Sequence, residues 1–343
     1  MKRITIDKPG GYSRLRLVEG ASPTPGPAEV LVETAGIGVN FADVVVRIGL
    51  YPSAKKYVGW PITPGFEFSG RVRAVGEDVR DLAVGSEVFG VTRFGAYASE
   101  LCVPRSQVFA APTGVPLATA GALPVPFLTA YYGLIVLGAA ASGKSVLVHS
   151  AAGGVGGALV QLGRLLGCRV VGVVGSAHKV EAARALGADV VIDKSAGNWF
   201  EQARAAAGEG FDVALDANGY ETLRQSYRLL RPTGRLVIYG AHSMLSRGSA
   251  RPNWAKLAWT YLRTPVFHPL QLTNDNKGVT AFNLSYLFEE QELLGGAMTQ
   301  LAEWFSSGRL RPPQVQQFPL AEVGRAHEAL QSGKTVGRLL LVP

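Results

Sequence analysis

Cysteine is nearly absent from this chain, and its scarcity excludes two classes of protein. Only Cys102 and Cys168 occur among the 343 residues. Neither a framework of several disulfides nor a structural zinc site with four cysteines can therefore form. Charged residues are also few, at 17%, whereas hydrophobic residues make up 47%. This composition provides ample material for a buried core and excludes a disordered, solvated chain.

We also expect neither a signal peptide nor a membrane-spanning run in this sequence. The N-terminus, from Met1 to Asp7, has no apolar h-region of the kind found in a signal peptide. Residues 118–141 are mostly apolar, but glycines and prolines interrupt them repeatedly. From these two absences we expect a cytoplasmic protein.

Blocks of basic residues are missing too, although the chain has 34 Lys and Arg against 26 Asp and Glu, a net charge of +8. A basic balance suits phosphate-bearing ligands, nucleic acid or an anionic membrane, or it only keeps the protein in solution. No window contains five or more consecutive basic residues. An extended contact with nucleic acid is therefore not indicated.

Residues 253–262 combine apolar residues at helical spacing with two tryptophans, and they lie among Arg247, Arg251, Lys256 and Arg263. One hypothesis is a helix that lies on a membrane surface. The interpretation that we favour is a flap over a substrate cleft, or packing between domains.

The coarse pattern of the chain changes after about residue 122. Before it, short strand-like runs alternate with turn residues, and one helix is expected to begin near Asn40, a good N-cap. After it, apolar strands alternate with helices; the strands are expected at 145–149, 169–174, 189–192, 211–215 and 235–239. This alternation predicts βαβ units and a doubly wound parallel sheet. Residues 240–278 read as irregular, and strands and helices return in the last third.

A glycine-rich loop follows the strand expected at 145–149 and opens a helix. Its sequence, from Ala151 to Gly156, is Ala-Ala-Gly-Gly-Val-Gly, with alanine where the dinucleotide fingerprint has its first glycine. Gly153 permits close approach of the backbone to a pyrophosphate, and Gly156 permits close packing of helix on strand. The helix N-terminus offers unpaired amides and a positive dipole end. This context predicts binding of a dinucleotide.

The chain resembles the medium-chain dehydrogenase/reductase superfamily, in its zinc-free quinone oxidoreductase branch. The segments that carry the resemblance span most of the chain in order: Gly38–Asp43, Gly49–Pro52, Pro64–Glu67, Gly95–Ala98, Leu128–Tyr131 and the glycine loop. The C-terminal part, including Phe282–Leu284 and Gly333–Gly337, is most similar to the vesicle amine transport protein subgroup.

This resemblance implies an α/β fold in which a GroES-like β-rich catalytic domain is interrupted by a Rossmann domain. We expect the catalytic domain at 1–123 and 288–343, and the Rossmann domain, which binds NADP(H), at 124–287. It also implies a homodimer that pairs Rossmann edge strands, here Val279 to Asn283.

Zinc is not expected. Zinc-dependent relatives use two cysteines and a histidine as catalytic ligands, and the matching positions are Asn40, Phe66 and Val125. None of these three is a good zinc ligand, and Glu67 alone does not make a site. Without a Lewis acid to polarise an alcohol, the chemistry favours hydride delivery to an acceptor that is already electrophilic.

The expected cofactor is NADPH. An NAD site carries an acidic residue about twenty positions past the glycine loop, where this chain has Gly175 to Lys179 and no carboxylate. Ser176 and Lys179 can bind a 2′-phosphate, and Lys194 is a further candidate. Lys179 could also be an ordinary solvated lysine. The remaining positions that the resemblance assigns to the cofactor are Asn40, Thr129, Ala152, Gly153, Gly154, Val155, Asn218, Tyr239, Gly240, Phe282 and Leu284.

Catalysis is assigned by the resemblance to Tyr51, Asn40 and Asp43, which border the nicotinamide and substrate. Tyr51 would protonate or orient the substrate, and its donor would stabilise the negative charge that develops on a quinone or enone oxygen. Structural roles remain open, because Asn40 and Asp43 suit a helix start and Tyr51 suits packing. No serine nucleophile and no His/Asp pair in a convincing setting is found.

An apolar, aromatic neighbourhood suggests a hydrophobic small molecule as substrate. The alternative is a protein that binds NADPH with little catalysis, as a sensor or as a membrane- or RNA-associated factor.

Overall fold

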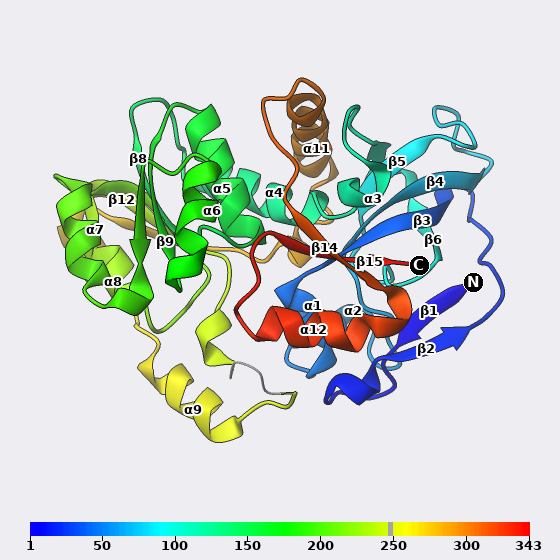
Figure 1. Ribbon diagram of the computed structural model, residues 1–343, viewed down its shortest axis with the longest axis horizontal. Coiled ribbons are helices and arrows are strands. Elements are labelled where there is room, and N and C mark those ends of the chain that lie inside the picture. The colour runs from blue at the N-terminus through cyan, green and yellow to red at the C-terminus, as the bar shows by residue number, and fades with distance from the viewer. Residues whose placement is uncertain (246–249) are drawn as a thin grey trace. The chain divides into compact units, whose positions relative to one another are not determined.

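The computed structural model describes residues 1–245 and 250–343, which form two compact units (Figure 1). Unit 1 contains Met1–Val125, Leu284–Pro343 and, between them, Ala250 and Arg251. Unit 2 contains residues 126–245 and Pro252–Asn283. The domain limits expected at 123/124 and 287/288 stay a prediction, because compact packing does not by itself establish which segments fold independently.

Unit 2 is built on a six-stranded parallel sheet in the order β10-β9-β8-β11-β12-β13. The strand order reverses beside β8, as in doubly wound nucleotide-binding folds. The strands are β8 (Ser145–His149), β9 (Arg169–Val174), β10 (Val190–Asp193), β11 (Phe211–Asp216), β12 (Leu230–Ile238) and β13 (Gly278–Ala281). The central strands are buried on both faces, which is why they read as continuous apolar runs in the sequence.

Unit 2 also contains several helices (Figure 1). They are α4 (Pro124–Tyr131), which continues as a π-helical turn Tyr132–Leu137, α5 (Gly154–Leu165), α6 (Val180–Ala185), α7 (Trp199–Ala207), α8 (Leu223–Arg228), α9 (Trp254–Arg263) and α10 (Pro269–Asp275). The last two correct the expectation of an irregular stretch at 240–278. Asn253 caps α9 by accepting the backbone N–H of Lys256, and Pro269 begins α10, so both helices have local start signals.

Unit 1 contains a seven-stranded, mostly antiparallel sheet and a two-stranded ribbon. The main path is β14-β15-β3-β4-β5-β7, and β6 also pairs with β3. The strands are β1 (Lys2–Thr5), β2 (Arg16–Glu19), β3 (Glu29–Val39), β4 (Glu67–Val75), β5 (Glu87–Val91), β6 (Glu100–Pro104), β7 (Val108–Ala110), β14 (Val315–Pro319) and β15 (Arg338–Val342). Strands from both ends of the chain thus meet at β3.

The helices of unit 1 are short except for one. They are α1 (Phe41–Arg47), α2 (Pro52–Tyr57), α3 (Leu117–Ala120), α11 (Gln291–Ser306) and α12 (Val323–Gln331). The expected helix after Asn40 is confirmed as α1. The core packs α12 residues such as Val323 and Ala326 against sheet residues such as Phe68 and Val32.

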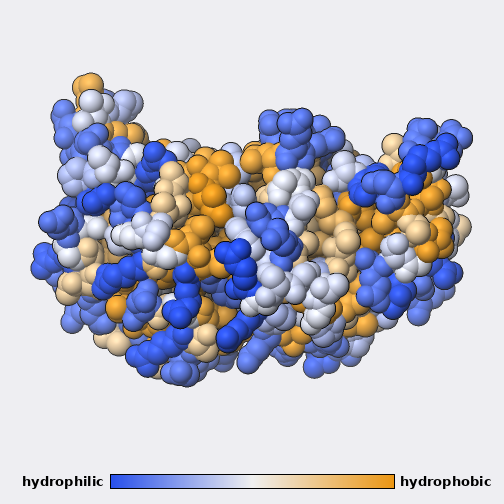
Figure 2. Space-filling view, turned by 90° about the horizontal axis from the view of Figure 1, so that it is seen from above, coloured by the Kyte–Doolittle hydropathy of each residue, from blue (hydrophilic) through white to orange (hydrophobic). Residues whose placement is uncertain are grey.

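On the face drawn in Figure 2, apolar patches lie between hydrophilic side chains, as is usual for a folded protein. Among the described residues, no helix has both the length and the apolar character needed to cross a bilayer.

Candidate cofactor and catalytic sites

The glycine loop of unit 2 joins the end of β8 to the start of α5, the position that a dinucleotide-binding turn requires. Gly153 is the N-cap residue, and the first bond of the helix runs from the N–H of Gly157 to the carbonyl of Gly153. The amides before Gly157 in the first turn therefore have no carbonyl partner within the helix. A Cβ at Gly156 would lie 2.1 Å from the carbonyl oxygen of Ser150, so only glycine fits. The turn is closely packed, and its amides can receive a pyrophosphate.

The end of β9 carries the residues expected to select the 2′-phosphate. Ser176 follows β9, and its hydroxyl lies 3.2 Å from Nδ1 of His178. Lys179 ends the 3-10 turn Ala177–Lys179, at the start of α6. This segment contains no carboxylate that could bind a ribose 2′-hydroxyl.

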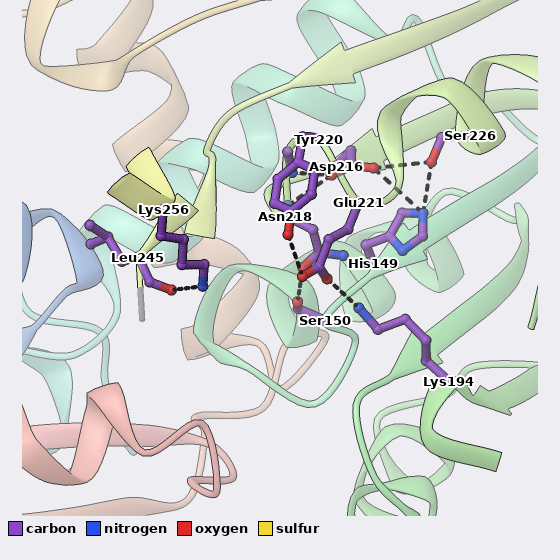
Figure 3. A network of polar contacts seen from close by, with 11 residues as sticks. His149, Ser150, Lys194, Asp216, Asn218, Tyr220, Glu221, Ser226, Leu245 and Lys256 are labelled. Atoms are coloured by element: carbon purple, nitrogen blue, oxygen red, sulfur yellow. Dashed lines mark hydrogen bonds and ion pairs between the residues drawn. The ribbon is translucent and has the colours of Figure 1, made fainter. Parts of the chain in front are cut away.

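Lys194 follows the next strand, β10, and forms an ion pair. Its Nζ lies 3.2 Å from Oε2 of Glu221 (Figure 3). The carboxylate and a 2′-phosphate would compete for the same ammonium group.

A buried polar network holds the ends of β8 and β11 together (Figure 3). His149 Nε2 lies 2.9 Å from the Ser226 hydroxyl, which donates to Asp216 at 3.0 Å. The other Asp216 oxygen accepts the backbone N–H of Asn218 at 2.8 Å, and the Ser150 hydroxyl donates to the Asn218 side chain at 3.2 Å. Burial lowers the pKa of His149, so the neutral imidazole is favoured.

The network contains a His/Asp pair, His149 with Asp216, but not in a setting that suits catalysis. His149, Asp216 and Ser226 are all fully buried, and the serine proton points to the aspartate. The three residues therefore cannot act as a nucleophilic triad on an external substrate. They fix the loop that carries Asn218, one of the residues expected to contact the cofactor.

The other expected cofactor positions are distributed over both units. Thr129 lies buried on α4, and Ala152 lies buried in the glycine loop. Gly154 and Val155, the first residues of α5, are partly exposed. Tyr239 and Gly240 follow β12, and Phe282 follows β13, with its ring centroid 6.4 Å from that of Tyr239. Leu284 belongs to unit 1, as does Asn40. Their roles stay predictions.

In unit 1, Asn40 is held by a buried ion pair. Its Nδ2 donates to Oε1 of Glu67 at 2.8 Å, and Arg338 donates to the same oxygen. The second oxygen of Glu67 accepts the backbone N–H of Val125 at 2.8 Å. Glu67 on β4 and Arg338 on β15 meet across β3 above Gly38, where a Cβ would lie 2.1 Å from Oε1 of Glu67. The missing side chain at Gly38 therefore makes room for the ion pair.

Asp43, in the first turn of α1, is fully buried with its oxygens engaged. Oδ2 accepts the N–H of Asn40 at 2.8 Å, and Oδ1 accepts the N–H of Gly65 at 3.0 Å. Burial raises the pKa of Asp43 to about 7, although these bonds and one from the Tyr97 hydroxyl act to lower it. Asp43 joins the start of α1 to the loop before β4, which is a positioning role.

Tyr51 precedes α2 and stands among aromatic rings. Its ring centroid lies 5.6 Å from that of Phe66 and 6.5 Å from that of Phe94, in both cases edge to face. Packing therefore orients the phenol, while the residue remains partly exposed.

Sequence reasoning missed the partners that hold these residues. Arg338 is 271 positions from Glu67, and His327, which lies 3.2 Å from the Tyr97 hydroxyl, is 230 positions from it. From the sequence, Glu67 is only a carboxylate that cannot form a zinc site alone. One signal in the sequence could have indicated a buried ion pair: Arg338 is a charged residue at the start of an otherwise apolar strand, Arg-Leu-Leu-Leu-Val.

Two family models match this sequence. The model described as alcohol dehydrogenase GroES-like domain matches residues 26–113, and the model described as zinc-binding dehydrogenase matches residues 186–341. The human "Synaptic vesicle membrane protein VAT-1 homolog" is 36% identical over 97% of this chain and 84% of its own length.

Solved structures of similar proteins cover the whole chain. The quinone oxidoreductase of Escherichia coli, solved in complex with NADPH, has a TM-score of 0.86 at 29% identity and is matched over 100% of both chains. The CurK enoyl reductase has a TM-score of 0.85 at 28% identity, over 99% of this chain and 98% of its own. These matches confirm the predicted fold class, a GroES-like β-rich part with a Rossmann parallel sheet.

The zinc that one model description implies does not fit the residues present. Asn40, Phe66 and Val125 occupy the positions matched to the ligands of zinc-dependent relatives, and the nearby carboxylate of Glu67 is bound to Arg338. Within 1–245 and 250–343, no group of three or more His, Cys, Asp or Glu is placed to hold a metal ion.

Proposed function

From the membership of this chain in the medium-chain dehydrogenase/reductase family, to which the VAT-1 homologues belong, we propose that it is a zinc-independent, NADPH-dependent reductase. Its acceptor would be a quinone or an α,β-unsaturated carbonyl. The observation that carries the proposal is the glycine turn after β8, in which Gly156 packs against Ser150 and leaves the first amides of α5 to a pyrophosphate. A quinone oxidoreductase and an enoyl reductase among the similar structures support the same acceptor classes.

The residues of unit 2 fit NADPH rather than NADH. Ser176 can donate a hydrogen bond to the 2′-phosphate, and the Lys179 ammonium can neutralise it. No acidic residue at the end of β9 would repel that phosphate. When bound, NADPH supplies the hydride, and the chain supplies binding, orientation and electrostatics.

In unit 1, we assign Tyr51 to the acceptor oxygen. Its hydroxyl would donate a hydrogen bond or a proton to that oxygen as negative charge develops. The Glu67–Arg338 pair holds the Asn40 amide, and Asp43 holds the start of α1, so these residues shape the site without transferring a proton. The rings of Phe66 and Phe94 beside Tyr51 suit a hydrophobic acceptor.

The test is NADPH oxidation by the pure protein with a panel of quinones, enones and enals, and with NADH as the control. We expect NADPH-selective turnover of at least one class. Tyr51→Phe should then reduce kcat by roughly tenfold to a thousandfold with unchanged NADPH affinity, the range that loss of a donor to a developing oxyanion covers. Tight NADPH binding without turnover on the whole panel would instead favour the alternative, a sensor or interaction protein.

We also propose a homodimer that pairs β13 with its copy, because β13 is an edge strand of the unit 2 sheet and presents unpaired backbone groups. Light scattering should give twice the chain mass. A monomeric mass at micromolar concentration would contradict this.

A further inference from the structure

An ion pair in unit 2 joins the loops that follow β10 and β11. Nζ of Lys194 lies 3.2 Å from Oε2 of Glu221 (Figure 3). Lys194 directly follows β10, and Glu221 lies in the loop between β11 and α8. In the sheet, β9 and β8 lie between these two strands, so the ends of β10 and β11 are about 14 Å apart at the usual strand spacing. The ion pair therefore bridges the ends of two strands to which neither residue is attached.

The two bridged strands carry the cofactor residues. β8 leads into the glycine turn, and Ser176 follows β9. Asp193 pairs with Val174, so Lys194 comes next at the same edge of the sheet. Burial lowers the pKa of His149, and the positive charge of Lys194 acts in the same direction, which places the ammonium near the end of β8. Because parallel strands end at one edge, the ion pair lies across the edge at which a dinucleotide binds.

The loop that carries Glu221 is fixed by the buried polar network. Oδ1 of Asp216 accepts the backbone N–H of Asn218 at 2.8 Å and that of Gly219 at 3.2 Å. Gly219 has a φ of 95°, a conformation that favours glycine, and it turns the chain toward Glu221. The ammonium of Lys194, in contrast, ends a flexible four-carbon side chain. The lysine is therefore the partner that can move to another anion.

Water reaches both members of this ion pair. The side chain of Lys194 is 24% exposed and that of Glu221 is 40% exposed. An ion pair in such a setting contributes little stability, so a stronger anion can displace the carboxylate. A phosphate group carries a charge of about −1.5 to −2 and three acceptor oxygens, and it is the stronger partner for the ammonium. An uncharged ribose 2′-hydroxyl is not.

We propose that Lys194 and Glu221 form a clasp that selects a cofactor with a 2′-phosphate. The proposal rests on the cofactor site of the proposed function. A dinucleotide that binds at this edge of the sheet separates the two side chains. NADPH replaces the lost contact, because its 2′-phosphate binds Lys194, whereas NADH leaves the ammonium without an anion. Glu221 is thus a selectivity residue that acts through Lys194 and does not touch the cofactor.

Two variants distinguish the clasp from an ordinary surface ion pair. Glu221→Gln and Lys194→Met both remove the clasp, so both should bind NADH more tightly than the wild type, by up to about fivefold, the range for an exposed ion pair. Their affinities for NADPH should change in opposite directions. Glu221→Gln should bind NADPH more tightly by a similar factor. Lys194→Met should bind NADPH about tenfold more weakly, because it also loses the contact with the phosphate.

Fluorescence titration of NADPH and NADH on the full chain, without an acceptor, measures these affinities. In competition with NADPH, 2′,5′-ADP should show the same changes as NADPH, because it has the phosphate but no nicotinamide. The double variant should bind NADH no more tightly than either single variant, since one contact can be removed only once. The control Glu322→Gln removes a carboxylate that is also 40% exposed and that pairs with Arg325 in unit 1, and it should change neither affinity.

Three outcomes would overturn the clasp. In the first, Glu221→Gln binds both cofactors as the Glu322→Gln control does. In the second, both clasp variants bind both cofactors more weakly, since the ion pair would then only hold the two loops in shape. In the third, the wild-type protein binds neither cofactor. Failure of the reductase assignment is distinguishable from these, because it would appear as normal NADPH binding without turnover of any quinone, enone or enal.

Discussion

The buried ion pair between Glu67 and Arg338 gives the sharpest test of how unit 1 is held together. Both side chains are buried, and the carboxylate accepts bonds from Asn40, Val125 and Arg338. Arg338→Met leaves the carboxylate without its cation. Breaking a buried pair in this way costs about 3–5 kcal/mol of unfolding free energy, because the remaining charge stays desolvated.

The pH dependence of this penalty has a definite sign. Burial raises the pKa of Glu67 from 4.5, and Arg338 acts to lower it. In Arg338→Met, the pKa of Glu67 in the folded protein rises further above its value in the unfolded protein. A group whose pKa is higher in the folded state than in the unfolded state stabilises the protein at low pH, and this contribution is lost as pH rises from the unfolded pKa through the folded pKa. The variant should therefore be destabilised more at pH 8 than at pH 5, where Glu67 can take up a proton.

Urea unfolding followed by circular dichroism measures the effect in a double-mutant cycle. Glu67→Gln and Arg338→Met should each destabilise strongly, and the double variant should cost less than their sum by about 2 kcal/mol or more. Arg71→Met breaks an exposed pair with Glu87 and should cost less than about 1 kcal/mol. A penalty for Arg338→Met as small as that of the exposed control, or independent of pH, would refute the reasoning.

Three further predictions concern the two candidate sites. Gly156→Val should weaken NADPH binding by at least about 100-fold with an unchanged circular dichroism spectrum, because its Cβ would meet the Ser150 carbonyl at 2.1 Å. The control Gly295→Ala places its Cβ in open space and should have no effect on binding. An unaltered NADPH affinity of Gly156→Val in fluorescence titration would contradict the assignment of the glycine loop to the cofactor. The double variant Ser176→Ala with Lys179→Gln should weaken NADPH binding about 10- to 100-fold, since a charge-assisted phosphate bond contributes about 1.5–3 kcal/mol. Its binding of NADH should be unchanged. An equal loss of affinity for both cofactors would contradict recognition of the 2′-phosphate by these residues. The pKa of Asp43 is about 7, against 3.8 for an ordinary side chain, so the free energy of unfolding should fall as pH rises between those values. In denaturant titrations, Asp43→Asn should flatten this dependence of the unfolding free energy on pH. If the dependence persists in the variant, another group causes it.

Several parts of the fold could be predicted from local sequence. The strands at 145–149 and 169–174 have the limits that their apolar runs indicate. Strands buried on both faces of a parallel sheet need continuous apolar residues, so they can be predicted without knowing which strands lie beside them. The glycine loop could be predicted because its turn requires glycine at fixed spacing.

Other elements were misjudged because tertiary contacts override local signals. The region before residue 122 is expected to contain only short strands, yet β3 runs unbroken from Glu29 to Val39 through glycines that resemble turn residues. Gly38 stands in the strand because the Glu67–Arg338 pair passes over it. Residues 240–278 looked irregular, yet α9 and α10 form there from short capped segments.

The sequence by itself determined the doubly wound sheet and the dinucleotide turn, since each depends on residues close together in the chain. It also determined that Asn40, Phe66 and Val125 stand where zinc-dependent relatives have ligands, since this depends only on residue identity. Only the tertiary structure decided which charges meet. β15 pairs with β3 and β3 with β4, and this alignment brings Arg338 to Glu67 and Glu67 to Asn40. Such pairing depends on strand register over hundreds of residues, which local periodicity does not encode.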